Sequence, residues 1–130
     1  WNFFDYRQRP RADALRFEEG TRNLTGLAGL GATIDRFLEI GTTNVERRIL
    51  ALTDHLEAGL RERGDRVTSP RGARERSGIL CCDRPGADMA PLFERLMSRR
   101  FIVSLRCGAI RLSPHFYNTA DEADRLLDLL

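Results

Sequence analysis

The sequence predicts an α/β fold of the α+β type, in which helices pack on a small, mostly antiparallel sheet. A chain of 130 residues can form one core but not a second domain of ordinary size. Its composition, 42% hydrophobic and 31% charged, is typical of a globular protein. From residue 43 onward, helical and strand patterns follow one another in the order αββαββα, and one further helix precedes them.

Residues 1–22 show no clean periodicity and are expected to form an extended arm, with residues 23–130 as the domain itself. Aromatic residues cluster at the start of the arm, at Trp1, Phe3, Phe4 and Tyr6. Such a dense cluster needs a partner surface. We therefore expect these side chains to be incompletely buried in this chain alone and to promote self-association.

Two helices are expected next. The first, over about 23–39, has one apolar side, formed by Leu27, Leu30, Ile34, Phe37 and Leu38. The second begins with Thr43 and Glu46, which have the spacing of a capping box, and it ends at Gly64. Its apolar residues recur at helical spacing, at Val45, Ile49, Leu52, Leu56 and Leu60.

Short strands are expected over 67–69 and 77–82, followed by a turn at 84–86. The loop between these strands contains the densest arginine stretch, 71–76, which we interpret as solvated. Asp88 is expected to cap a third helix, in which the methionines at 89 and 97 fill the core and bind no metal.

A hairpin and a last helix complete the predicted domain. Strands over 101–106 and 109–112 are joined by Cys107 and Gly108 as a two-residue loop, and Pro114 ends the second strand. A second capping box, Thr119 with Glu122, begins the last helix, whose apolar side contains Ala123, Leu126, Leu127 and Leu130.

The hairpin places two arginines on one face of the sheet. If Arg106 pairs with Ala109 and Ser104 pairs with Arg111, the two arginines lie on a diagonal of about 7–8 Å between Cα atoms. Two guanidinium groups this close repel each other unless an anion lies between them, and each can bind a carboxylate bidentately. Two interpretations stay open here: a carboxylate-binding pair, or solvated arginines on an exposed sheet face.

The charges exclude several kinds of function. The 21 basic residues are all arginine, against 19 acidic residues. Without lysine, the chain cannot form a Schiff base through a side chain. The arginines do not gather in a basic stripe with aromatic residues, so nucleic-acid binding is not expected. The longest uncharged run, 23–34, is too short to span a membrane.

Three cysteines are an odd number and two of them are adjacent, so they form no disulfide framework. No zinc-ligand spacing exists either, and a reducing, cytoplasmic compartment is the simplest interpretation. We expect Cys81 and Cys82 to be buried strand residues on opposite faces of the sheet. Cys107 is expected to be a turn residue, and His115 a hydrogen-bonded structural residue.

Several segments together resemble the C-terminal part of the class V aminotransferase family. They are the stretch Glu19-Gly20-Thr21-Arg22-Asn23, the glycine-rich helix, the helix from Asn44, and the run from Arg106 to Glu122. The family comprises pyridoxal-phosphate enzymes of fold type I, including aminotransferases, cysteine desulfurases, kynureninases and related epimerases. The resemblance covers nearly the whole chain. Its most specific part is the hairpin continued through Tyr117-Asn118-Thr119 and the acidic capping box.

The resemblance implies a role for particular residues. Arg111 would bind the α-carboxylate of an amino-acid substrate, with Arg106 beside it. Gly20 and Thr21 would contact the phosphate of pyridoxal phosphate in the neighbouring subunit, so the active enzyme would be a homodimer. A backbone N–H and a hydroxyl are good neutral donors to phosphate. From the residues alone, Thr21 is also a candidate cap of the following helix, and the two roles are compatible.

The resemblance also implies an N-terminal large domain that contributes the Schiff-base lysine, so no catalytic residue is assigned within this chain. Cysteine desulfurases of the family have a nucleophilic cysteine on a longer loop, whereas Cys107 lies on a tight turn. We therefore expect a transaminase or a related enzyme, with desulfurase, other lyase or epimerase activity as alternatives. The alternative outside the family is a stand-alone, non-catalytic module that binds an amino acid or another carboxylate, or a protein partner.

Overall fold

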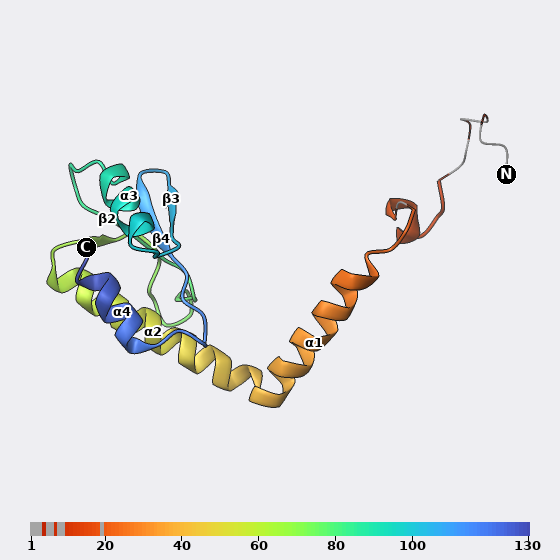
Figure 1. Cartoon of the computed structure of the whole chain (residues 1–130), viewed down its shortest axis with the longest axis horizontal. Coiled ribbons are helices and arrows are strands. Elements are labelled where there is room, and N and C mark those ends of the chain that lie inside the picture. Colours follow the sequence, from red (N-terminus) through yellow and green to blue (C-terminus); the bar gives the residue numbers. More distant parts are fainter. Residues whose placement is uncertain (1–3, 5–6, 8–9, 19) are drawn as a thin grey trace. The chain divides into compact units, whose positions relative to one another are not determined.

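The computed structural model describes residues 4, 7, 10–18 and 20–130 (Figure 1). It contains two compact units, Trp1–Glu39 and Ile40–Leu130, which we describe separately. Of the aromatic cluster at the start of the chain, only Phe4 lies among the described residues, and its side chain is 85% exposed. The expected exposure of Trp1, Phe3 and Tyr6 concerns residues outside the described part.

The first unit contains one long helix. In the arm, a short 3-10 helix, η1 (Ala14–Phe17), interrupts the extended chain that we expected, because the side chain of Asp13 accepts from the amide of Leu15. α1 (Leu24–Ile40) follows, close to the predicted bounds. None of its residues is buried, and the apolar residues Leu27, Leu30 and Ile34 are each about half exposed. The predicted apolar side of this helix is therefore open to solvent in this chain.

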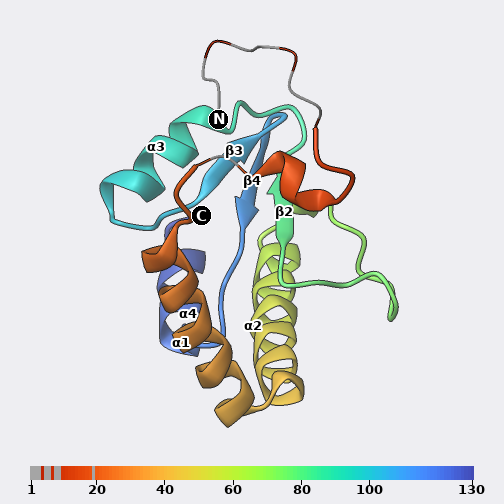
Figure 2. The same ribbon diagram turned by 90° about the vertical axis from the view of Figure 1, so that its right-hand side faces the viewer.

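The second unit has the predicted α+β order. It consists of α2 (Thr42–Glu62), β1 (Arg66–Val67), β2 (Leu80–Asp83), α3 (Ala90–Ser98), β3 (Ser104–Arg106), β4 (Ala109–Leu112) and α4 (Ala120–Leu127). The strands form one antiparallel sheet in the order β1-β2-β4-β3, with β4 between β2 and β3 (Figure 2). Among the described residues, no helix is long and apolar enough to cross a membrane.

One face of the sheet forms the core. The strands contribute Leu80, Cys82, Ile110 and Leu112, all almost completely buried. The three helices of the unit cover these residues, chiefly with Leu56, Leu60, Leu96, Leu126 and Leu127. α2 and α4 lie side by side against this face (Figure 1). The alternate residues of the strands point to the opposite face of the sheet, which these helices do not cover.

The helix caps confirm one prediction and correct others. Thr119 and Glu122 form the expected capping box of α4. The capping box predicted from Thr43 and Glu46 is wrong, because α2 begins two residues earlier than that box requires. Its N-cap is Gly41, at a φ of 86° that favours glycine, and no side chain caps that end.

α3 and the strands also differ slightly from the predicted bounds. The N-cap of α3 is Met89 and not Asp88, although the Asp88 carboxylate accepts from the amide of Ala90 at 3.0 Å. β3 begins at Ser104 and not at residue 101, because the amide of Phe101 is bound to the Leu96 carbonyl at the end of α3. Residues 101–103 have the sequence pattern of a strand. The amide of Phe101, however, bonds to the end of α3 and is not available to a neighbouring strand.

We expect Thr119→Ala to lower the free energy of unfolding by about 1 kcal/mol, because it removes the hydroxyl that accepts from the amide of Glu122. Thr43→Ala is the matched control and should be nearly neutral, since Thr43 caps nothing in α2. Urea unfolding followed by circular dichroism measures both variants. Equal losses of stability in the two variants would contradict this assignment of the caps.

Candidate functional site

The β3–β4 hairpin has the predicted register. Ser104 pairs with Arg111, Leu105 with Ile110, and Arg106 with Ala109. The turn residues Cys107 and Gly108 both have positive φ, 49° and 78°, as a two-residue turn of the primed type requires. The predicted hairpin is therefore confirmed in its register and in its turn.

This register directs Arg106 and Arg111 to the sheet face opposite the core, since Ile110 and Leu112 on either side of Arg111 are core residues. Arg111 is half-buried, and its Nε atom is fully buried without a hydrogen-bond partner among the described residues. Leaving a buried donor unpaired costs about 1–3 kcal/mol. A bound carboxylate would remove that cost.

The acidic residue on the neighbouring strand is already paired. Asp83 of β2 accepts two hydrogen bonds from Arg66 of β1, at 2.8 and 2.7 Å. These bonds hold the pKa of Asp83 below its usual value, so the carboxylate stays charged and bound to Arg66. Among the described residues, neither Arg106 nor Arg111 makes an ion pair. The sheet face at the hairpin therefore keeps a surplus of positive charge.

Hydrogen bonds fix the segment after β4. The Asn118 side chain accepts from the amide of His115 at 2.8 Å and donates to Glu122 at 3.1 Å. Arg48 of α2 donates to the Asn118 carbonyl at 3.0 Å. The backbone amide of Thr119 and the Asn118 side chain lower the pKa of Glu122.

Ring stacking adds to these bonds. The rings of His115 and Tyr117 stack with their centroids 4.8 Å apart. This network holds the chain in place directly beyond Arg111.

Gly20 and Thr21 lie in the first unit, just before α1. Gly20 has a φ of 56°, and a Cβ atom built there would have no neighbour within 4 Å. Thr21 is exposed and makes no hydrogen bond with any residue that the structure describes. The interpretation of Thr21 as a helix cap is wrong, because Asn23 caps α1 by accepting from the amide of Gly26 at 2.9 Å. The Thr21 hydroxyl is therefore available to a ligand.

All three cysteines are free, and they differ in environment. Cys82 is 1% exposed, and burial raises the pKa of its thiol to about 12. Cys81 is the strand partner of Arg111, so it lies on the same face as Arg111, opposite the core. It is half-buried, and the expectation that both cysteines are buried therefore holds only for Cys82. Cys107 is exposed on the turn. No group of three or more metal-ligating side chains occurs among the described residues.

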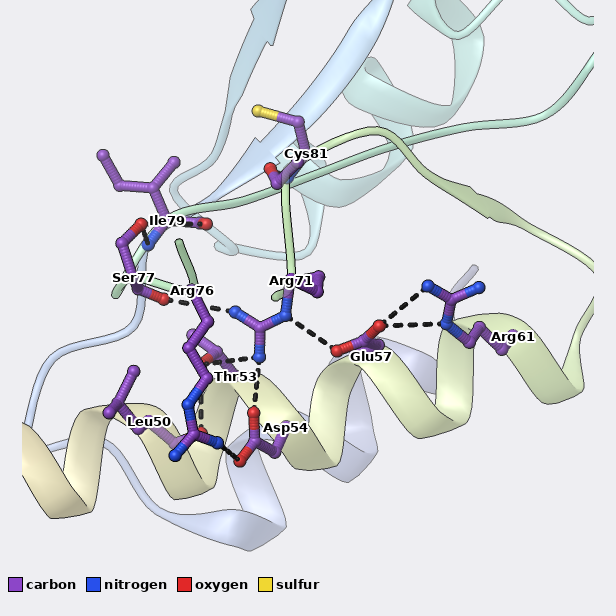
Figure 3. A network of polar contacts seen from close by, with 11 residues as sticks. Leu50, Thr53, Asp54, Glu57, Arg61, Arg71, Arg76, Ser77, Ile79 and Cys81 are labelled. Atoms are coloured by element: carbon purple, nitrogen blue, oxygen red, sulfur yellow. Dashed lines mark hydrogen bonds and ion pairs between the residues drawn. The ribbon is translucent and has the colours of Figure 1, made fainter. Parts of the chain in front are cut away.

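Sequence reasoning missed a network around Arg71. This side chain is only 7% exposed and binds Glu57 at 2.7 Å, together with Asp54 and the Ser77 carbonyl (Figure 3). Burial by itself raises the pKa of Glu57, but hydrogen bonds from Arg71 and Arg61 outweigh it and keep that pKa below its usual value.

The stretch 71–76 is therefore not simply a solvated loop. Arg71 attaches it to α2, and Arg76 adds an ion pair with Asp54 at 2.7 Å. The carboxylates lie one helical turn apart on α2, at Asp54 and Glu57, which is the only sign of the network that the sequence offers.

Comparison with known proteins identifies the family. A model of the family described as aminotransferase class-V matches residues 6–126. The chain belongs to the class V aminotransferase family. The resemblance inferred from the hairpin and the Tyr117-Asn118-Thr119 segment is thereby confirmed.

Several members of this family are similar to the chain. Isopenicillin N epimerase from Streptomyces clavuligerus is 33% identical over 119 residues, which are 86% of this chain and 30% of the epimerase. A probable cysteine desulfurase from Methanothermobacter thermautotrophicus is 29% identical, and the match covers 88% of this chain and 33% of that protein.

The apo structure of a cysteine desulfurase from Thermococcus onnurineus superposes with a TM-score of 0.79 at 27% identity, covering 88% of this chain and 32% of that one. This class V chain therefore spans about a third of the length of the relatives it matches.

We expect a thiol reagent such as iodoacetamide to modify Cys107 first and Cys82 only after unfolding, since Cys82 is buried and its pKa is about 12. The unfolded thiol ionises near pH 8.5, so the stability that neutral Cys82 provides is complete below that pH and is lost as pH rises toward 12. Mass spectrometry of peptides after timed labelling measures the order. Labelling of Cys82 in the native chain as fast as Cys107 would contradict this assignment.

Proposed function

We propose that this chain is the C-terminal small domain of a pyridoxal-phosphate-dependent enzyme of the class V family that acts on an amino acid. The observation that supports this most directly is the buried, unpaired Nε of Arg111 on an otherwise positive sheet face. Family membership makes an amino-acid carboxylate the ligand that this nitrogen would bind.

Arg111 would hold the substrate through its planar guanidinium, which offers Nε–H and Nη–H as parallel donors to two carboxylate oxygens. Arg106, on the diagonal of the same face, would add positive charge without a fixed partner of its own. Because Asp83 is bound to Arg66, it does not compete with the substrate for either arginine. Fixing the carboxylate in this way orients the substrate Cα and its bonds.

Gly20 and Thr21 fit the phosphate of the cofactor in their chemistry. The backbone at Gly20 is open, and the Thr21 hydroxyl has no hydrogen bond among the described residues. When bound, pyridoxal phosphate supplies an electron sink for the bonds at the substrate Cα. We propose that Gly20 and Thr21 contact the phosphate of a second subunit, so that the enzyme acts as a homodimer.

The chain contains no lysine, so the amine that binds the cofactor would come from an N-terminal large domain outside these residues. The relatives, which are about three times longer than the matched part, support such a domain. Three free cysteines fit a reducing, cytoplasmic compartment.

The geometry favours transamination or epimerisation over desulfuration. Cys107 occupies a two-residue turn with its backbone fixed at positive φ, which leaves little reach for a mobile sulfur carrier. A second candidate function is a non-catalytic module that binds an amino acid or another carboxylate, and the buried, unpaired Nε of Arg111 would serve that function equally.

The isolated chain should be catalytically inactive, because it has no side-chain amine to hold the cofactor. Incubation with pyridoxal phosphate, reduction with borohydride and peptide mapping should find an adduct only at the α-amino terminus. A stoichiometric adduct elsewhere, or turnover of any amino acid, would exclude the proposed division of roles.

In the enzyme that contains this chain, Arg111→Ala should raise KM and lower kcat/KM about ten- to a hundred-fold, as expected for loss of a charge-assisted contact of about 1.5–3 kcal/mol. Cofactor absorbance should not change. Arg111→Lys should restore little, because an ammonium lacks the planar fork. Arg106→Ala should have the smaller effect. Near-normal kinetics of Arg111→Ala would contradict this role and would favour the alternative that both arginines are merely solvated.

A further inference from the structure

The unit Ile40–Leu130 has a groove on the side of the sheet away from Arg111. It measures about 650 Å³ and lies between residues 99–103 and the start of α4. Its floor consists of buried core side chains, among them Leu52, Leu112 and Leu126. At its rim, Ile102 and Tyr117 are 84% and 72% exposed. A hollow of this size, with an apolar floor, is in the range of ligand sites.

The charges of the groove are not balanced. Arg99, Arg100 and Arg125 line it, whereas Glu122 is its only acidic residue among those described. Glu122 already accepts from Asn118 and from the amide of Thr119. Within the described part of the chain, none of the three arginines makes an ion pair, although many other arginines of the chain do. The groove is thus lined by three arginines against one carboxylate, that of Glu122, whose pKa is lowered by the Thr119 amide, by the Asn118 side chain and also by the charge of Arg125.

Arg100 has an unfavourable backbone conformation. The amides of Arg100 and Phe101 bind the carbonyls of Met97 and Leu96, at 3.0 Å each, and so close α3 with a Schellman motif. Arg100 occupies the left-handed position of that motif with a φ of 66°, where glycine is the favoured residue. This conformation ends α3 and places Arg100 among the residues that line the groove.

We propose that this groove binds an acidic peptide segment of a partner protein, with an apolar side chain on the floor and carboxylates at the arginines. Arginines from both sides of the groove, Arg99 and Arg100 at the end of α3 and Arg125 on α4, match several carboxylates better than a single small anion, which would contact one side only. The exposed Ile102 and Tyr117 extend the apolar contact beyond the hollow, as an extended peptide requires.

The probe is a synthetic hexapeptide with blocked ends, Asp-Glu-Leu-Phe-Glu-Asp, and the matched control peptide is Asn-Gln-Leu-Phe-Gln-Asn. Calorimetry with the full-length protein that contains this chain should detect binding of the acidic peptide that weakens with added salt, and much weaker binding of the neutral one. Arg99→Gln and Arg125→Gln should each weaken binding about two- to five-fold, as expected for exposed charge pairs.

Arg100→Gly gives the sharpest test, because the two expected effects have opposite signs. Glycine relieves the strain and should raise Tm by several degrees, while loss of the guanidinium should weaken peptide binding about two- to five-fold. A role in stability alone would not produce both changes. Arg74→Gln is the matched control, since Arg74 is exposed, makes no ion pair with described residues and does not line the groove.

Some outcomes would overturn the proposal. They are absence of binding at millimolar peptide, equal binding of the neutral peptide, and equal weakening by Arg74→Gln, which would indicate unspecific attraction. Arg111→Ala should leave peptide binding unchanged, because Arg111 does not line the groove. The proposed role of Arg111 in substrate binding can therefore fail without affecting this result, and the reverse also holds.

Discussion

The alternation of side chains along β4 is the constraint on which the rest of the second unit depends. β4 pairs with β2 on one side and β3 on the other, so its residues fix the register of three strands. Ile110 and Leu112 are among the most deeply buried residues of the core. A shift of one residue would bring the Arg111 guanidinium into that core and expose both apolar side chains, at a cost that no other contact offsets. The requirement that Ile110 and Leu112 lie in the core thus also places Arg111, the candidate residue for binding a carboxylate, on the open face of the sheet.

The parts of the fold that could be predicted from the sequence are those determined locally. The two-residue turn at Cys107 and Gly108 sets the hairpin register, and Thr119 with Glu122 sets the start of α4. Thr43 and Glu46 have the same spacing and fail, because the chain enters α2 at Gly41 with positive φ and needs no side-chain cap. A capping-box pattern predicts a helix start correctly only where the preceding backbone has the conformation of a side-chain cap. The sequence does not show that conformation.

Long-range contacts account for what could not be predicted. Arg71 is buried by partners on α2, 14 and 17 residues earlier in the chain, and nothing in a stretch rich in Arg and Gly indicates this. The same holds for the candidate site. The face on which Arg111 lies followed from the hairpin, but the burial of its unpaired Nε did not follow from the sequence. Thr21 and Asn23 are both plausible caps by residue type, and the hydrogen bond to Gly26 decides between them.

The two edges of the sheet have a further consequence. The edge strands are β1, with two residues, and β3, with three. Strands this short expose few unpaired backbone groups, so they are poor templates for adding a strand from another molecule. Growth of the sheet into cross-β aggregates is therefore disfavoured at both ends, and association of this unit would proceed through its side-chain surfaces.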